Sequence, residues 1–141
     1  MGIFVEIKKG DSFSLPPKRV TSEMIAKYAD AANDHNPLHV DMEFAKTTRY
    51  GGIIAHGMLS MAFLQELMVR TFGAAWLSSG TIEVGFGNPV RPGDEVLTEA
   101  KVTGVAPVEG KENESMVRLQ LVCTTGDGQK VISGKATVAL S

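Results

Sequence analysis

Residues 57–72 read GMLSMAFLQELMVRTF, and no other stretch constrains the architecture of this chain as strongly. The run contains no proline and is followed by Gly73, a residue type common just past the end of a helix, so it predicts a helix over Gly57–Phe72. Apolar residues lie almost all round this helix, and the polar exceptions include Ser60, Gln65, Glu66 and Arg70. Such a helix has to be wrapped by other elements rather than laid on a surface.

The second half of the chain supplies the wrapping. Four segments are rich in Val, Thr and Ile, often alternate apolar with polar residues, and are separated by turn clusters, as antiparallel strands are. They are Ser78–Val90, Glu95–Val105, Met116–Thr125 and Lys130–Leu140. A further strand is expected within Ser12–Val20, where Pro16 and Pro17 suit a sheet edge.

The first half is helical. Apolar residues between Thr21 and Asn33 are spaced as on one face of a helix, and Met42–Thr48 is expected to add a short helix. Pro37 cannot continue a helix, so Asp34–Asp41 is expected to be a structured loop. Helices first and strands later predict an α+β fold, with an antiparallel sheet wrapped around a long buried helix.

The 141 residues contain no repeat or flexible linker, so residues 1–141 are expected to form one domain. A curled sheet has exposed edges, and pairing with a second copy would cover one; we therefore expect a homodimer or a higher oligomer. A formal charge of −2 without a run of Lys and Arg argues against a nucleic-acid partner. The apolar stretch Ile53–Val69 contains His56, Gln65 and Glu66, which argues against a membrane span.

A cytoplasmic location is expected. Met1–Gly10 lacks the apolar core of a signal peptide, and the single cysteine, Cys123, suits a reducing compartment and excludes a disulfide within the chain. Cys123 lies in an apolar strand segment without a nearby base, so it is interpreted as a buried strand residue rather than a nucleophile.

The segment Asp34–Asp41 carries the first candidate chemistry. Asp34 and His39 are five residues apart and cannot share a helix face, but a bend at Pro37 would bring both side chains to one point. A histidine titrates near neutral pH, and a nearby carboxylate can orient it or share a water molecule with it. The two residues form a candidate acid–base pair, although the spacing alone is a weak pattern that more often belongs to turn or surface residues.

The second candidate segment is Ile54-Ala55-His56-Gly57-Met58. Gly57 opens the apolar helix, so unpaired N–H groups and the positive end of the helix dipole face any group bound there. A carbonyl oxygen that gains negative charge would be stabilised at this position. The plainer interpretation is that Gly57 relieves crowding and that His56 caps the helix.

Together the two segments resemble the MaoC-like dehydratases, which include the R-specific enoyl-CoA hydratases and the 3-hydroxyacyl-ACP dehydratases of hot-dog fold. The resemblance follows most of the chain in order: the first helix, the Asp34-to-His39 loop with Asn36 and Pro37, the Ile54–Met58 segment, the buried helix and the strands. It implies a hot-dog fold and a hydro-lyase acting on an acyl thioester of coenzyme A or acyl carrier protein.

By the resemblance, Asp34 and His39 activate one water for addition across the C2=C3 bond of a trans-2-enoyl thioester, and Gly57 N–H holds the thioester carbonyl. Asn36 supports the geometry of the pair, His56 shapes the helix start, and these two with Ile54 and Ala55 are the expected substrate-binding residues. No cofactor or metal is expected. Where short-chain members carry a small hydroxyl residue in the buried helix, this chain has Gln65 and Glu66, which could shorten the acyl pocket.

Two alternatives stay open. A hot-dog thioesterase would use a carboxylate-activated water on the carbonyl, and would release free thiol. A non-catalytic subunit would grip the acyl chain for a catalytic partner in a hetero-oligomer.

Overall fold

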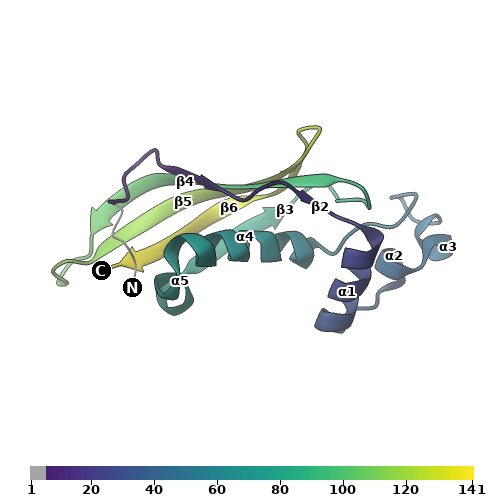
Figure 1. Cartoon of the computed structure of the whole chain (residues 1–141), viewed down its shortest axis with the longest axis horizontal. Coiled ribbons are helices and arrows are strands. Elements are labelled where there is room, and N and C mark those ends of the chain that lie inside the picture. Colours follow the sequence, from purple (N-terminus) through teal and green to yellow (C-terminus); the bar gives the residue numbers. More distant parts are fainter. Residues whose placement is uncertain (1–5) are drawn as a thin grey trace.

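The structure, a computed structural model, describes residues 6–141 and shows a curved sheet with a long helix along one face (Figure 1). The helices are α1 (Ser22–Ala32), α2 (Pro37–Val40), α3 (Met42–Ala45), α4 (Gly57–Phe72) and α5 (Ala74–Ser79). The strands are β1 (Ser12–Ser14), β2 (Lys18–Arg19), β3 (Thr81–Phe86), β4 (Glu95–Pro107), β5 (Ser115–Thr125) and β6 (Lys130–Leu140). Residues 1–5, which carry part of the expectation about a signal peptide, lie outside the described residues.

Within residues 6–141 the strands form one antiparallel sheet in the order β1-β4-β5-β6-β3, and β2 also pairs with β4. The predicted alternation holds in β4, where Val96, Thr98, Ala100 and Val102 are buried and the residues between them are not. Because successive strand side chains point to opposite faces, one face of the sheet is apolar and lies against α4.

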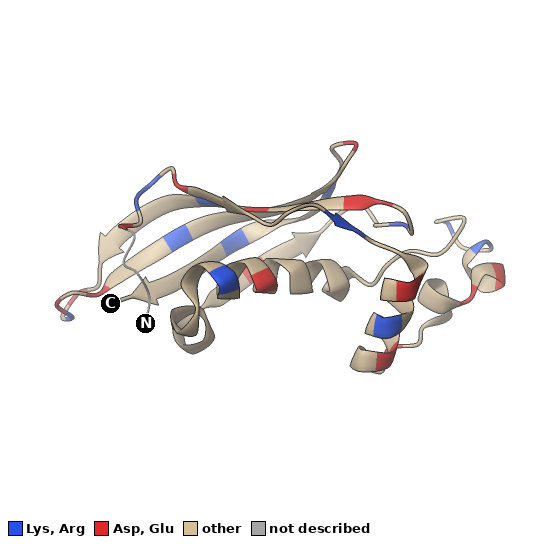
Figure 2. Ribbon diagram, in the orientation of Figure 1, with Lys and Arg blue, Asp and Glu red and all other residues tan. Residues whose placement is uncertain are grey.

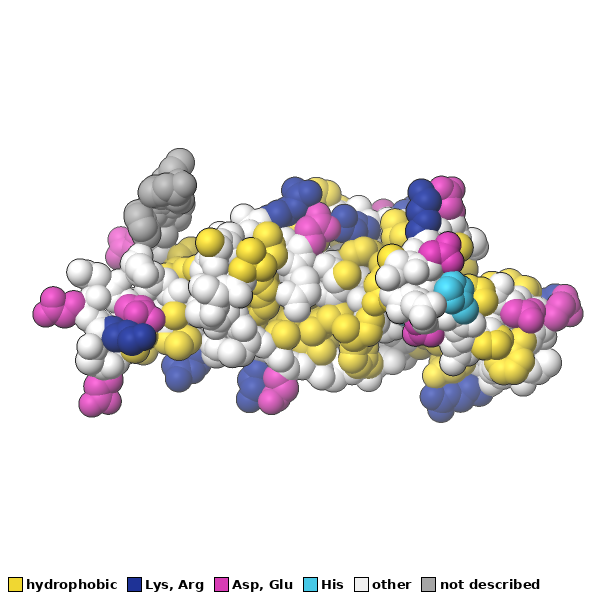
Figure 3. Space-filling model, turned by 90° about the horizontal axis from the view of Figure 1, so that it is seen from below, with side chains coloured by type: hydrophobic (Ala, Val, Ile, Leu, Met, Phe, Trp, Pro, Cys, Tyr) yellow, Lys and Arg dark blue, Asp and Glu magenta, His cyan; other side chains and the backbone are white. Residues whose placement is uncertain are grey.

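Helix α4 packs on this face. Its Leu64 and Met68 are fully buried in one core cluster with Leu119 and Leu121 of β5. The opposite side of α4 is open: Met58 is 54% exposed, and Figure 3, a view from that side, shows apolar side chains gathered along the middle of the molecule. Within residues 6–141 the sheet therefore wraps this helix from one side only, and the apolar side chains on its other side stay partly uncovered.

Three local expectations are corrected. Gly73, with φ of 59°, ends α4 and lets the chain enter α5. Helix α5 was not predicted from the sequence, and because of it β3 begins at Thr81 rather than Ser78. The predicted N-terminal strand is split into β1 and β2, because Pro16 and Pro17 between them have no N–H to donate to the ladder.

The described part of the chain contains no helix long and apolar enough to cross a membrane. Figure 2 shows lysine and arginine positions interspersed with acidic ones along the ribbon, without a continuous basic stripe.

Candidate active site

Asp34 is held directly after the end of α1. Asn33 adopts a left-handed conformation with φ of 53°, which ends the helix, and the Asp34 N–H donates to the Ala29 carbonyl at 2.9 Å. The Asp34 Oδ1 accepts a hydrogen bond from the Asn36 N–H at 3.3 Å. The carboxylate is exposed, and this local turn sets its direction.

His39 lies on α2, a short helix inside the segment that was expected to be a loop. The Asn36 side chain caps this helix by accepting from the Leu38 N–H at 3.0 Å, and Pro37 occupies its first position, where no N–H is needed. The expectation of a loop was wrong because Pro37 starts a helix here instead of only ending one.

One hydrogen bond decides how the His39 ring can act. Its Nδ1 lies 2.7 Å from the Ile54 carbonyl oxygen. A carbonyl can only accept, so Nδ1 carries the proton of the neutral ring and Nε2 keeps a free lone pair. His39 is half-buried, and its Nε2 is available as a base.

His56 is the residue before α4, yet its side chain makes no capping hydrogen bond to that helix. Its Nε2 instead lies 3.0 Å from the Asp34 carbonyl oxygen, to which it donates. The ring is stacked on His39, with centroids 3.8 Å apart and planes 25° apart. Ser, Thr, Asn or Asp at this position would contribute about 1 kcal/mol as a cap, so the histidine forgoes a common stabilisation.

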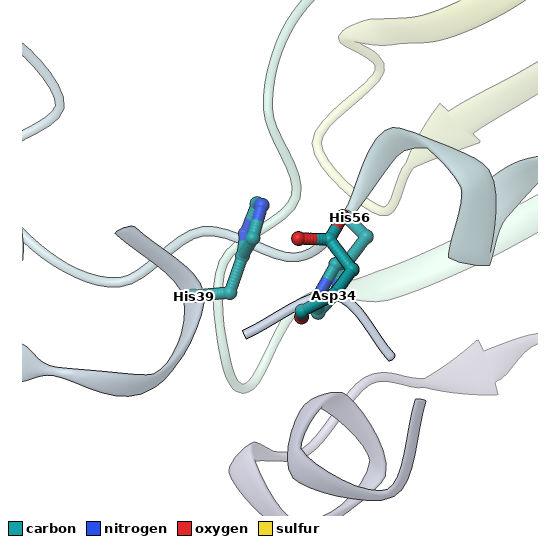
Figure 4. Close-up of side chains that lie close together, drawn as sticks. All are labelled: Asp34, His39 and His56. Atoms are coloured by element: carbon teal, nitrogen blue, oxygen red, sulfur yellow. Dashed lines mark hydrogen bonds between the residues drawn. The ribbon is translucent and has the colours of Figure 1, made fainter. Parts of the chain in front are cut away.

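Asp34, His39 and His56 thus converge from three segments, as Figure 4 shows, and one polar atom of each lies within 4.8 Å of the others. Two histidines and a carboxylate are also a donor set that Zn²⁺ accepts. A shared ion needs lone pairs that point at one place, whereas two nearly parallel stacked rings direct theirs along separate planes. The stacking therefore does not fit a metal ion shared by both rings.

Gly57 is the first residue of the 16-residue helix α4, so its N–H has no partner within the helix. A Cβ at this position would lie 2.9 Å from Cδ1 of Phe86, which is closer than side chains pack. A cavity of about 160 Å³ borders Gly57. Its lining consists of Tyr50, Ile54, Ala55, Gly57, Ser60, Phe86, Gly87, Asn88, Pro89, Val90 and Val131.

Ile54 connects the cavity with the acid–base pair. It lines the cavity, and its carbonyl accepts the hydrogen bond from His39, whereas Asp34, His39 and His56 do not belong to the lining. Asn36 is exposed, and it does not belong to the cavity lining either.

Gln65 and Glu66, the two residues that were expected to alter the acyl pocket, both form polar contacts with other side chains. Gln65 Oε1 accepts from the indole N–H of Trp76 at 2.8 Å, and Glu66 forms ion pairs with Lys18 at 3.0 Å and Arg70 at 2.9 Å. The Lys18 ammonium, hydrogen-bonded to Glu66, holds the pKa of that carboxyl below its ordinary value. Neither residue lines the cavity beside Gly57.

Ser60 and Phe86 are two of the cavity residues that were not among the expected site residues. Ser60 lies one turn after Gly57 and is 1% exposed, and a hydroxyl near the start of a largely apolar helix was the available signal. Phe86 carried no signal, because it reaches Gly57 only through the pairing of β3 with β6. Cys123 is buried as expected, and burial raises the pKa of its thiol to about 11.

Comparison with known proteins shows which proteins this chain is similar to. The family model described as MaoC like domain matches residues 6–124. The chain is 37% identical over 139 residues to an (R)-specific enoyl-CoA hydratase of Rhodospirillum rubrum, which covers 96% of this chain and 89% of that protein. It is 34% identical over 122 residues to a mitochondrial 3-hydroxyacyl-[acyl-carrier-protein] dehydratase of Arabidopsis thaliana, which covers 85% of this chain and 70% of that protein.

Among solved structures, the crystal structure of a MaoC-like dehydratase from Rhodospirillum rubrum matches with a TM-score of 0.81 at 29% identity, covering 99% of this chain and 97% of that one. This match confirms the expected α+β hot-dog fold, with its antiparallel sheet around a long helix.

Proposed function

The chain belongs to the family of MaoC-like domains, and on that premise we propose that it is a hydro-lyase that interconverts trans-2-enoyl and (3R)-3-hydroxyacyl thioesters. The relative from Rhodospirillum rubrum is named for the hydration and the one from Arabidopsis thaliana for the dehydration. The observation that carries the proposal is the meeting of Asp34 with a His39 ring whose Nδ1–H is committed to Ile54.

In the hydration direction, one water molecule lies between the Asp34 carboxylate and His39 Nε2. His39 accepts a proton from this water as the water oxygen bonds to C3 of the substrate. The electron pair of the C2=C3 bond moves toward the thioester, whose carbonyl oxygen gains negative charge. A proton returned by the pair to C2 completes the addition, and dehydration follows the same steps in reverse.

The Gly57 N–H is the donor proposed for the thioester oxygen. It has no partner within α4 and lies at the positive end of the helix dipole. A donor of this type is worth roughly 3 kcal/mol when it faces charge that develops during the reaction. The cavity beside Gly57 then receives the atoms next to the carbonyl, with Ile54 and Ala55 as apolar walls.

The experiment is a hydration assay on the purified chain, in which the absorbance of the conjugated enoyl thioester decays. Asp34→Asn and His39→Ala should each lower kcat by about 10² or more, because general acid–base groups contribute 10²–10⁴-fold. His35→Gln is the matched control: this histidine is in the same segment, but it is exposed and bonded to Asp30 at 2.8 Å. Near-native activity in either test variant would overturn the assignment.

Further measurements on the same purified chain separate the alternative functions. Release of free thiol from an acyl-CoA without hydration would indicate a thioesterase. Binding of enoyl-CoA without turnover, together with activity of a mixed oligomer, would indicate a non-catalytic subunit. Running CoA and acyl-carrier-protein substrates side by side identifies the carrier.

We further propose that the protein is a cytoplasmic homodimer or larger assembly of single-domain chains. Strand β3 pairs with one neighbour, β6, and leaves its other edge free in the described residues. Leu77 is 76% exposed and Phe86 54% exposed near this edge, and the open side of α4 exposes Met58. A monomeric mass in sedimentation equilibrium at micromolar concentration would refute the dimer.

A further inference from the structure

His56 is the best-connected side chain around the acid–base pair, although nothing in the proposed proton transfers uses it. It is 2% exposed and lies 22 residues after Asp34 and 17 after His39 in the sequence. It nevertheless contacts both: its Nε2 donates to the Asp34 carbonyl at 3.0 Å, and its ring stacks on His39 at 3.8 Å.

The other contacts of the ring leave it little freedom. The Tyr28 ring of α1 packs against it at a centroid distance of 4.9 Å, tilted by 56°. Since Nε2 must carry the proton that goes to the Asp34 carbonyl, Nδ1 is unprotonated, and this buried atom has no hydrogen-bond partner among the described residues. The side chain therefore gives up one hydrogen bond and a helix cap in exchange for contacts with the two reacting residues.

The segment Ile54–His56 acts on the pair as a template. The Ile54 carbonyl fixes the rotation of the His39 ring through Nδ1, and the His56 ring fixes the plane against which it lies. The Nε2–H of the His56 ring donates to the Asp34 carbonyl and so fixes the backbone that carries the Asp34 carboxylate. The positions of both reacting groups are thus fixed by the same three residues at the start of α4.

We infer that His56 is a positioning residue, which holds the Asp34 carboxylate and His39 Nε2 on one point through a donated hydrogen bond and a stacked ring. This inference deepens the proposed function and rests on it for its kinetic consequence. His56 contributes no proton to the reaction, because its one N–H is committed to a backbone carbonyl and its other nitrogen is enclosed.

Two variants separate the two contacts. His56→Gln keeps an N–H donor within reach of the Asp34 carbonyl but has no ring, whereas His56→Phe keeps a ring to stack on His39 but has no donor. A displacement of about 1 Å in a reacting group costs about 10²-fold in rate, so each variant should lower kcat by about 10- to 100-fold. KM should stay within about threefold, because ground-state binding does not use the pair. His35→Gln is again the control and should keep native kcat.

A spectroscopic measurement tests the arrangement without turnover. Imidazole ¹⁵N–¹H correlation spectra of the unmodified chain should show His39 as the Nδ1–H tautomer and His56 as the Nε2–H tautomer. The His39 ring protons should be shifted upfield by the stacked ring, lose that shift in His56→Gln and keep it in His56→Phe. This result supports the inference even if a variant fails to fold, since the unmodified protein carries the tautomer test.

Three results would overturn the inference. They are native kcat in both His56 variants, an Nδ1–H tautomer at His56, and His39 signals that do not respond to His56→Gln. An inactive but correctly folded chain with the expected spectra would refute the proposed function and leave the His56 contacts established.

Discussion

Replacement of Gly57 by alanine should separate activity from stability. The added Cβ would lie 2.9 Å from Cδ1 and 3.0 Å from Cε1 of Phe86. Phe86 is 54% exposed, so its ring can rotate away into solvent at small cost. The substitution leaves the Gly57 N–H in place and crowds only the space in front of it.

The magnitudes follow from these contacts. Alanine is favoured over glycine in a helix by up to about 1 kcal/mol, and the crowding of Phe86 opposes this gain, so the free energy of unfolding should change by less than about 1 kcal/mol. A substrate carbonyl displaced by about 1 Å from the donor should lose about 10² in kcat/KM. That loss corresponds to about 2.7 kcal/mol of transition-state stabilisation.

Urea unfolding and the enoyl thioester assay, made on the same preparation, measure the two effects. Gly85→Ala is the matched control, because it lies next to Phe86 on β3 and a Cβ there meets nothing within 4 Å. Phe86→Ala added to Gly57→Ala removes the crowding by the ring but not the methyl group in front of the N–H. Native kcat/KM in Gly57→Ala would refute the role of this amide, as would an activity loss matched by loss of folded protein.

Two further predictions concern groups away from the reaction. The hydrogen bond from Lys18 lowers the pKa of Glu66, so the stabilisation is present above the ordinary carboxyl pKa and is lost as pH falls through the lower, folded-state value. Lys18→Met should therefore lower the free energy of unfolding at pH 7 by less than about 1 kcal/mol, since both side chains are about 30% exposed, and urea titrations in acid should show this difference shrinking. Burial raises the pKa of Cys123 to about 11, so iodoacetamide at pH 8 should label the native thiol about 10²-fold more slowly than the unfolded one; equal rates by mass spectrometry would contradict the burial.

The site could be anticipated from the sequence where its geometry is local. The turn that ends α1, the short helix α2 that Pro37 begins, and the glycine that opens α4 depend on proline φ and on helix ends, which are properties of neighbouring residues. The identity of Asp34 and His39 as a pair was thus predictable, whereas the free nitrogen of His39 was not. It depends on the Ile54 carbonyl, fifteen residues away.

Other parts of the structure could not be predicted from the sequence for the same reason. Helix α5 depends on Gly73, which turns the chain, and on the hydrogen bond that Trp76 of α5 donates to Gln65 of α4. Gln65 was expected to shorten or reorganise the acyl pocket, and its hydrogen bond with Trp76 could not be predicted from its position on α4. Its direction is set by Trp76, and α4 is covered by the sheet on one side only.

Amino-acid order alone determined the features that depend only on residues close together in the sequence. These are the long apolar helix, the alternating strands, and the carboxylate and imidazole that lie on one short segment. The tertiary structure decided what depends on distant segments meeting. It set the tautomer of His39, the stacking of His56, the phenyl ring over Gly57 and the side of α4 left open. Packing and hydrogen bonds between remote residues act only once the chain is folded, so no local pattern records them.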